Sequence, residues 1–306
     1  MKKYGSISID IDPLWHYLEV RDWKPKEQTK LNTIYDDAIP RLLDLFGKHN
    51  IKATFFIVGK DALLKRNSAL LRKISDMGHE IANHTMNHVQ NFIGLSKEEK
   101  ENEIKAMDEL VTDIIGKKIV GFRAPGWNID NETIEILEKR NYLYDSSVFP
   151  SSFVPFMKIA HFIKNRGRGA TCFGRPFYIF FAPRLPYSPH HNRIWAKGNR
   201  KIQEFPISVL PFLRFPFFGT LVYFWGVKFF NLSYRIFKLR NSFLNYELHG
   251  LDLADFTDIN DERLRVKSGI TLKLETKIHI WDTIFSKLAN DFELIPICRL
   301  LKDKHF

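Results

Sequence analysis

The chain has little of what marks a disulfide-stabilised or membrane-spanning protein. Its 306 residues include two cysteines, Cys172 and Cys298, which lie far apart and outside any C-x-x-C pattern. Such usage is typical of ordinary thiols in a reducing compartment. The sequence has no run of about 18 uncharged apolar residues, so we do not expect a membrane-spanning helix. Asp10 and Asp12 interrupt the first apolar run too early for a signal peptide, and we therefore expect a cytoplasmic protein.

Acidic residues are scarce in one part of the chain. The whole chain is 44% hydrophobic and 26% charged, which is ordinary for a globular protein, and its net charge is +11. Residues 146–246, however, contain 15 lysines and arginines, a single acid, Glu204, and more than half of the aromatic residues. We interpret this basic aromatic segment, residues 146–246, as an insertion within one domain that spans residues 1–306.

Outside the basic aromatic segment, the apolar periodicity alternates between strands and helices. A helix from residue 96 begins with a capping box formed by Ser96 and Glu99. Repeated β-α units with almost continuously apolar strands indicate a parallel sheet covered by helices. Because the pattern returns after residue 246, we expect an α/β fold of the closed or distorted barrel kind. The predicted strands are residues 4–11, 52–58, 79–83, 118–122, 142–145 and 292–297, and the predicted helices are 35–49, 61–77, 96–115, 130–140 and 271–288.

Two short motifs stand where predicted strands run into loops, which is where α/β folds carry their chemistry. A D-I-D run, Asp10 to Asp12, ends the first strand, and an H-T-M-N-H run, His84 to His88, follows the third. One carboxylate and two imidazoles make a three-ligand site with an open position, which is typical of catalytic zinc. One helical turn would place both imidazoles on the same face. Each motif alone also fits solvated loop acids or unrelated surface histidines, so it is their combination that favours a metal site.

Further polar residues stand near other strand ends. Arg123 opens an R-A-P-G-W run, where it can pair with Asp10 and keep that carboxylate ionised and oriented. The Gly126 N–H follows a proline and can point at a developing oxyanion. His249, in a Y-E-L-H-G run, can act as a general acid. Taken singly, these residues also fit a surface arginine, a Pro-Gly turn and a structural histidine.

Together these motifs resemble those of the polysaccharide deacetylases, the NodB-homology group that forms carbohydrate esterase family 4. The D-I-D run resembles the family's first motif, the H-T-M-N-H run its His-Ser/Thr-x-x-His motif, R-A-P its Arg-x-Pro motif, and the Leu-His pair ending at His249 its late histidine motif. The Y-D-S-S run at 144–147 and the E-F-P run at 204–206 are also similar to pieces of this family. The resemblance covers residues 4–148 and 245–298.

The resemblance implies a distorted (β/α) barrel of about seven parallel strands and a bound divalent metal, most simply zinc. Two departures stand out: Glu247 replaces the leucine of the Leu-x-His motif, and the sequence has no clear Asp-x-x-Asp-Trp motif, which leaves Asp145 as a loose candidate for tuning the acid. The implied roles are metal binding by Asp12, His84 and His88, general base by Asp10 with Arg123 as its partner, general acid by His249, and oxyanion or substrate binding by Gly126, Trp127 and Asp145.

The basic aromatic segment is not needed for this chemistry, so we expect it to bear on the substrate. Residues 215–227 are uncharged and apolar but too short to span a bilayer. Cations interleaved with aromatics follow, which is typical of an element at an anionic membrane surface. These aromatics can equally fill the barrel's core. Nucleic-acid binding is not expected, since no such motif accompanies the charge. An R-G-R-G run at 166–169 is a weak candidate for binding phosphate.

These patterns favour a metal-dependent hydrolase that removes an N-acyl group from an amino sugar. Some relatives in the family act on polyprenyl-phosphate sugars, and the composition of the basic aromatic segment favours a sugar on a lipid phosphate at the cytoplasmic membrane face. Peptidoglycan or a capsular exopolysaccharide is the alternative substrate. A carbohydrate-binding protein without turnover would need neither Asp10 nor His249. A basic membrane or nucleic-acid adaptor forms a third class.

Overall fold

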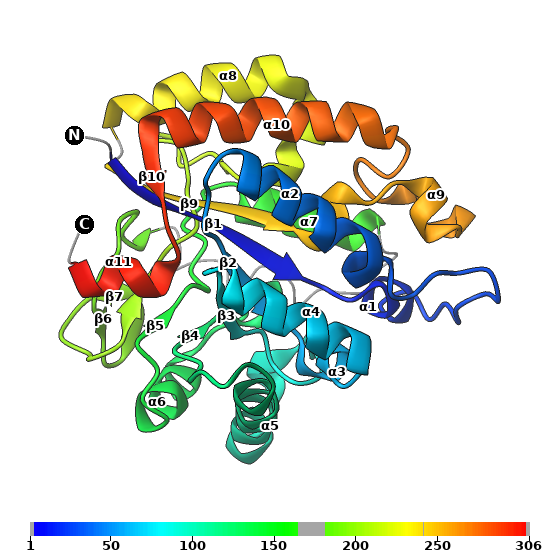
Figure 1. The fold of residues 1–306 in the computed structure, drawn as a ribbon. Helices are drawn as coiled ribbons and strands as arrows, with labels where there is room; N and C mark the ends of the chain where they lie inside the picture. Colours follow the sequence, from blue (N-terminus) through cyan, green and yellow to red (C-terminus); the bar gives the residue numbers. More distant parts are fainter. Residues whose placement is uncertain (1–2, 165–180, 241, 304–306) are drawn as a thin grey trace.

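A single sheet of parallel strands forms the centre of the computed structural model, which describes residues 3–164, 181–240 and 242–303 (Figure 1). Hydrogen-bonded neighbours follow the order β9-β1-β2-β3-β4-β5-β8, and the short β10 pairs with the first residues of β1. A separate hairpin of β6 (Pro189–His190) and β7 (Arg193–Lys197) is antiparallel. The strands of the sheet are β1 (Lys3–Ile11), β2 (Thr54–Ile57), β3 (Glu80–Asn83), β4 (Gly121–Phe122), β5 (Tyr144–Asp145), β8 (Gln203–Glu204), β9 (Phe243–His249) and β10 (Phe292–Leu294).

Hydrogen bonds between the chain after β8 and strand β9 bring the two ends of the sheet together. The Ser208 N–H donates to the Asn245 carbonyl at 3.1 Å, and the Asn245 N–H donates to Ser208 Oγ at 2.9 Å. The Asn245 side-chain amide also donates to the Phe205 carbonyl at 3.0 Å. The sheet of seven parallel strands is therefore curled into a distorted barrel, and the predicted fold class is confirmed.

Helices cover the outside of the curled sheet, and α8 and α10 lie side by side (Figure 1). Lys238 of α8 donates to Asp291 of α10 at 2.8 Å, and the Tyr234 hydroxyl donates to the same carboxylate at 2.7 Å. The helices are α1 (Leu14–Glu19), α2 (Ile39–Lys48), α3 (Gly59–Ala62), α4 (Lys65–Asp76), α5 (Lys97–Ile115), α6 (Asn131–Lys139), α7 (Val154–Lys164), α8 (Val222–Arg240), α9 (Phe256–Ile259), α10 (Leu274–Asp291) and α11 (Ile297–Asp303).

Most predicted elements are present, with differences at their boundaries. Helix α5 begins after Ser96 with the expected capping box. The predicted helix at 61–77 is instead two helices, because Leu64 is extended and caps α4. The predicted strand at 118–122 shortens to two paired residues, and the predicted helix at 35–49 begins with a π-helical turn, Ile34–Ala38. Each difference lies at the end of an element. Main-chain hydrogen bonding sets these ends, and the periodicity of apolar residues does not report it.

The basic aromatic segment is built into the barrel. It supplies β8 to the sheet, and its Phe217 ring packs against Phe237 at 4.8 Å and Tyr246 at 5.2 Å between ring centroids. Part of its aromatic content is therefore core. The R-G-R-G run at 166–169 and Cys172 lie outside the described residues.

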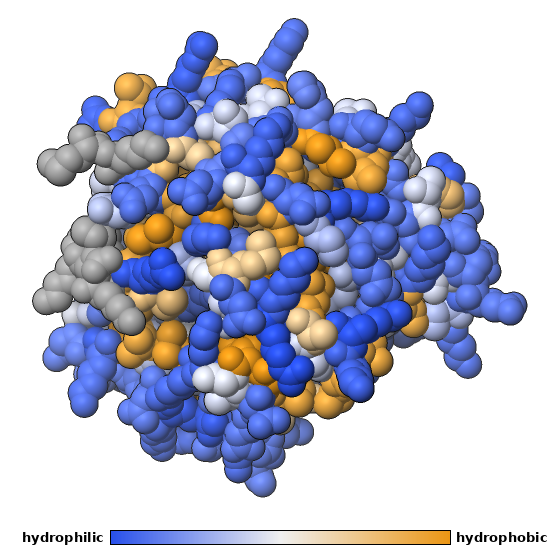
Figure 2. Space-filling model, in the orientation of Figure 1, coloured by the Kyte–Doolittle hydropathy of each residue, from blue (hydrophilic) through white to orange (hydrophobic). Residues whose placement is uncertain are grey.

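On the face shown in Figure 2, polar and charged side chains predominate, and apolar side chains are exposed in smaller separate areas. Among the residues that the structure describes, no helix combines the length and the apolar character needed to cross a bilayer.

The strand register brings the predicted motifs to one end of the barrel. Asp10 is paired with His249 across β1 and β9. Asn83 is paired with Phe122 across β3 and β4, so the residues that follow them, His84 and Arg123, also become neighbours. Because all these strands are parallel, their carboxyl ends meet at the same rim, as in other barrels that carry their chemistry there.

Candidate active site

The three predicted metal ligands converge at this rim. His88 Nε2 lies 3.0 Å from Asp12 Oδ1, and His84 Nε2 lies 3.4 Å from the same oxygen. Both imidazoles are almost fully buried. The ligand atoms of all three residues lie within 4.8 Å of one another, which is the spacing of a group that can hold a metal ion.

The loop that presents the two histidines is not helical, so the expected helical turn is wrong. Thr85 and His88 have φ values of 65° and 52°, in the left-handed region. The Asn83 side chain accepts from the Thr85 N–H at 2.7 Å, and Thr85 Oγ1 accepts from the His88 N–H at 3.0 Å. These bonds hold Thr85, which is β-branched, in a left-handed backbone conformation whose strain costs about 1–3 kcal/mol. The rings converge because of this strained loop rather than because of helical spacing.

The hydrogen bonds of the ligands fit a bound cation. His84 Nδ1 lies 2.7 Å from the Arg123 carbonyl, which can only accept, so Nδ1 carries the proton and Nε2 keeps its lone pair. Asp12 Oδ1 and both ring nitrogens of His88 are buried without a hydrogen-bond partner in the described structure, and buried polar atoms rarely lack one. A cation between these atoms would satisfy them.

Asp12 is ionised despite its burial. Burial alone would raise the pKa of its carboxyl, but the adjacent His88 and His84 imidazoles hold that pKa well below its usual range. The Tyr17 hydroxyl of α1 donates to Asp12 Oδ2 at 3.2 Å and orients the carboxylate from the other side. Tyr17 had no sequence signal of its own.

Asp10 is fixed by Arg123, as the motifs predicted. Arg123 Nη1 donates to Asp10 Oδ1 at 2.5 Å, while Nη2 donates to Ser8 Oγ at 3.0 Å and to Ser146 Oγ at 2.8 Å. The guanidinium is fully buried and packs over the Phe56 ring at 4.1 Å. With Oδ1 occupied, Asp10 Oδ2 is left on the metal-site side, 4.0 Å from His84 Nε2.

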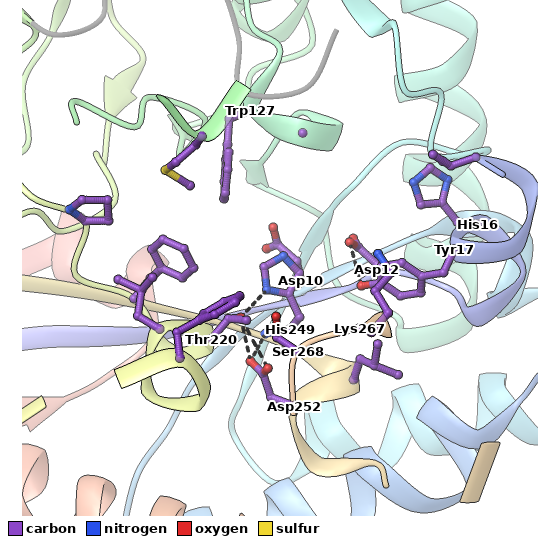
Figure 3. A pocket seen from close by; sticks show the side chains of 18 of the residues that line it. Asp10, Asp12, His16, Tyr17, Trp127, Thr220, His249, Asp252, Lys267 and Ser268 are labelled. Carbon is purple, nitrogen blue, oxygen red and sulfur yellow. Dashed lines mark hydrogen bonds between the residues drawn. The ribbon is translucent and has the colours of Figure 1, made fainter. Parts of the chain in front are cut away.

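His249 has a carboxylate neighbour that sequence reasoning missed. The Asp252 side chain accepts from the His249 main-chain N–H at 2.9 Å, and the Asp252 N–H donates back to the His249 side chain. Thr220 Oγ1 lies 3.5 Å from His249 Nδ1 and 3.4 Å from Asp252 (Figure 3). The sequence does contain a signal for this pair. An acid stands three residues after the histidine, and this is the spacing of a capping box.

Asp145 lies apart from the acid. Its carboxylate accepts from Ser147 Oγ at 2.6 Å, and its strand position is paired with that of Glu204. Burial and the adjacent Asp145 charge raise the pKa of the Glu204 carboxyl well above its usual value. Asp145 is fully buried beneath the rim, so the structure gives the position next to His249 to Asp252 instead.

Trp127 and Gly126 line the same cavity as Asp10, Asp12 and His249. Both have positive φ values, 58° and 60°. The Trp127 indole N–H donates to Glu247 Oε1 at 3.0 Å, and its ring packs on Phe149 at 5.0 Å between centroids. Glu247, which replaces the family's leucine, therefore lies fully buried behind the wall and holds Trp127 in place.

One cavity of about 570 Å³ is lined by the three predicted metal ligands together with Asp10 and His249 (Figure 3). Asp10, Asp12 and His249 lie at its base. Arg21 and Lys267 contribute cationic groups near Tyr17. Another part of the lining is apolar and comes entirely from the basic aromatic segment: Phe153, Met157, Phe215, Phe218, Leu221 and Trp225.

Comparison with known proteins confirms the family resemblance. Residues 26–144 match the family model described as polysaccharide deacetylase, a range that includes His84, His88 and Arg123. Over 119 residues, 39% of this chain and 40% of the relative, the sequence is 36% identical to a peptidoglycan deacetylase of Helicobacter pylori. It is 27% identical over 124 residues to a peptidoglycan-N-acetylglucosamine deacetylase of Bacillus cereus, covering 39% of this chain and 44% of that one. The chain thus spans less than half the length of these curated relatives.

A solved structure shares the fold over nearly the whole chain. A protein of Mycobacterium smegmatis, by name a polysaccharide deacetylase, superposes with a TM-score of 0.65 over 99% of this chain and 91% of its own, at 15% sequence identity. The likeness supports a NodB-type distorted (β/α) barrel that includes the basic aromatic segment.

Proposed function

We propose that this chain is a metal-dependent hydrolase that removes the acyl group from the nitrogen of an amino sugar. The observation that carries the proposal is the shared cavity in which Asp12, His84 and His88 form a three-ligand site beside Asp10 and His249. The family match over residues 26–144 agrees with it.

The residues divide the work by their positions. A divalent cation held by Asp12, His84 and His88 would lower the pKa of a bound water and polarise the acyl carbonyl. Two imidazoles and one carboxylate suit zinc, which we propose as the metal. Asp10 takes the proton from the attacking water, because Arg123 fixes Asp10 Oδ1 and Asp10 Oδ2 lies 4.0 Å from His84 Nε2, on the side of the metal site.

The departure of the amine requires a second proton transfer. When the C–N bond breaks, the nitrogen takes the bonding electron pair and leaves poorly unless it is protonated. We assign this proton to His249, which is paired with Asp10 across neighbouring strands. The Gly126 N–H, in the wall of the same cavity, is assigned to the oxygen that gains negative charge. The products are a short carboxylic acid and a free amino sugar.

For the substrate we propose a sugar carried on a lipid phosphate. Most of the apolar cavity lining comes from the basic aromatic segment, which lies outside residues 26–144, the range that matches the family. A free sugar needs no such wall, whereas the lipid portion of a lipid-linked sugar does. The cytoplasmic side of the membrane stays our prediction from composition.

Peptidoglycan or another polymer is the second candidate substrate, because the two relatives described above are named as peptidoglycan deacetylases. The test is acid release from three N-acetylated substrates: a polyprenyl-phosphate sugar, a soluble oligosaccharide and peptidoglycan. Preference for the first supports the proposal, and preference for peptidoglycan assigns the second candidate. If no acid is released from any of them by the metal-loaded protein, or if Asp10→Asn releases as much as the unmodified chain, the reaction is wrongly assigned.

A further inference from the structure

The outward side of α8 carries apolar and basic side chains in alternation. Lys228, Leu232, Arg235 and Leu239 recur at helical spacing and so lie along one face. Leu232 is 58% exposed and Leu239 79% exposed. The two cations, Lys228 and Arg235, are also exposed. The buried side of the same helix carries the aromatics that fill the core. A helix that only covered a barrel would show polar side chains here, so the exposed leucines need a partner.

A loop beside α8 extends this surface. Phe212 and Leu213 are 77% and 73% exposed, among the highest values for large apolar side chains in the described residues. The Arg240 guanidinium at the end of α8 lies 5.5 Å from the centre of the Phe212 ring, which places the loop against the helix. Phe212 also has a φ value of 69°, so the backbone that presents this ring is held in an unfavourable conformation.

The surface is continuous with the catalytic cavity. Phe224 and Trp225, just before the regular part of α8, line the cavity and are also 59% and 49% exposed. The Phe215 ring, another part of the cavity lining, lies 5.2 Å from Trp225 and 4.6 Å from Phe153 between centroids. Exposed apolar side chains at the start of α8 therefore reach into the cavity that contains Asp10.

The charge of this surface has one sign. Glu204 is the one acid in residues 146–246, and it is buried on β8 at 1% exposure. Lys238 points to the other side of α8 and pairs with Asp291, whereas Lys228 and Arg235 are exposed among the leucines. Exposed apolar groups with cations between them match the acyl boundary and the headgroups of an anionic bilayer, since long basic side chains reach the headgroups while apolar ones enter below them.

We propose that the docking face, defined as the exposed side chains Phe212, Leu213, Phe224, Trp225, Leu232 and Leu239 with the cations between them, binds the surface of an anionic lipid bilayer. It holds the cavity mouth at the headgroups, so that a lipid-borne sugar reaches the site without leaving the membrane. This last step rests on the proposed function, whereas the docking itself does not.

The test of docking is co-sedimentation of the full chain with phosphatidylcholine vesicles, with and without phosphatidylglycerol. The unmodified chain binds the anionic vesicles and is released by salt. Leu232→Ser with Leu239→Ser, and separately Lys228→Glu with Arg235→Glu, weaken binding by at least about tenfold. Leu63→Ser with Leu64→Ser is the matched control, because these leucines are also exposed, at 60% and 48%, but precede α4. The control binds as the unmodified chain does.

Three results overturn the docking face. The first is absence of vesicle binding at low salt, and the second is an equal loss of binding in the control. The third is self-association of the chain that Leu232→Ser with Leu239→Ser abolishes, which gives the face to a second copy. Turnover separates this inference from the proposed reaction: the leucine variant keeps acid release from a soluble N-acetylated sugar and loses it from a vesicle-embedded one. A failed reaction assignment leaves neither release, whatever the vesicles bind.

Discussion

The Trp127 indole N–H donates to Glu247 Oε1 at 3.0 Å, so a buried carboxyl group fixes one wall of the cavity that contains the candidate active site. Burial raises the pKa of Glu247 well above its usual value, and the nearby Asp10 carboxylate raises it further. Glu247, which departs from the family motif, therefore interacts with Trp127 and Asp10, two residues to which the motifs assign a role.

Replacing Glu247 tests this tie. Glu247→Gln keeps an acceptor for the indole and leaves stability close to that of the unmodified chain. Glu247→Leu leaves the buried Trp127 N–H without an acceptor and lowers the free energy of unfolding by about 1–3 kcal/mol, with a raised KM. Urea unfolding and acid-release kinetics measure both. Glu293→Leu, on the exposed side of β10, is the matched control and changes neither. A leucine variant as stable and active as the unmodified chain would contradict the role given to this bond.

Replacing Asp10 and replacing Asp12 should have different effects on metal binding and turnover. Asp10→Asn should keep stoichiometric metal, because the proposed ligands are Asp12, His84 and His88, and should lower kcat by about 10²–10⁴-fold. Asp12→Ala loses the metal itself. Elemental analysis of the purified variants, together with acid release, distinguishes the two outcomes. Asp113→Asn, on the exposed side of α5, serves as the control. Metal loss in Asp10→Asn with retention in Asp12→Ala would reverse the assignment.

Metal removal should destabilise the fold around the ligand loop. A ligand that binds only the folded state stabilises it by about 2.7 kcal/mol at one hundred times its dissociation constant. Chelation therefore lowers the melting temperature of the unmodified chain and leaves that of Asp12→Ala unchanged. Differential scanning fluorimetry with and without added zinc measures the shift. An equal response of both proteins to the chelator would place the cation elsewhere.

The role of His249 can be tested through the leaving group. Amide cleavage requires protonation of the amine, so His249→Ala lowers acid release from an N-acetyl sugar by about 10²–10⁴-fold. A 4-nitrophenyl ester releases a phenolate that needs no proton, and its hydrolysis falls far less. Asp252→Asn weakens amide cleavage in the same selective way, because it removes the carboxylate beside the histidine. His279→Ala, at an exposed position of α10, is the control. Equal losses on both substrates would exclude a role as general acid.

The pH dependence of stability should show the contribution of His79. Burial lowers the pKa of this imidazole to about 4, and the neutral ring accepts from the Ala53 N–H at 3.0 Å. The unfolded chain, with an ordinary histidine pKa near 6.5, binds the proton first as pH falls. The stability is therefore fully present above pH 6.5 and is lost towards pH 4, by up to about 1.4 kcal/mol per pH unit.

His79→Gln retains an acceptor for the Ala53 N–H but cannot titrate. Urea midpoints of this variant change less between pH 7 and pH 5 than those of the unmodified chain. His279→Ala is again the control, since its exposed ring leaves the slope unaltered. If the slope of His79→Gln matches that of the unmodified chain, other groups cause the loss at acid pH.

Local sequence patterns were sufficient for the rim of the barrel. Apolar runs followed by Asp10 and Asp12, by His84, and by Arg123 predicted both the strands and the residues at their ends. A parallel sheet then brings those ends together whatever the loops do, because its strands all point one way. For the same reason the partnership of Arg123 with Asp10 could be predicted across 113 residues.

Other relationships depend on how loops and segments pack and were not visible in one sequence. The partner of His249 is Asp252 rather than Asp145, because the chain turns back on itself after β9 and closes a capping box there. Glu247 could not be assigned to Trp127, since nothing in either motif reports the other. The basic aromatic segment was open between core and membrane, and the structure divides it: Phe217 and Tyr246 pack inside, while Leu232 and Leu239 face out.

The amino-acid sequence by itself determined which side chains stand at the strand ends that form the rim, and these residues are the basis of the class of reaction that we propose. Short-range apolar periodicity determines where each strand ends, and that information is local. Only the tertiary structure decided how the proposed metal ligands converge, through the left-handed backbone conformations of Thr85 and His88. It also decided which side chains form the wall of the cavity. Those features are sums of contacts between distant residues, and such contacts exist only after the chain has folded.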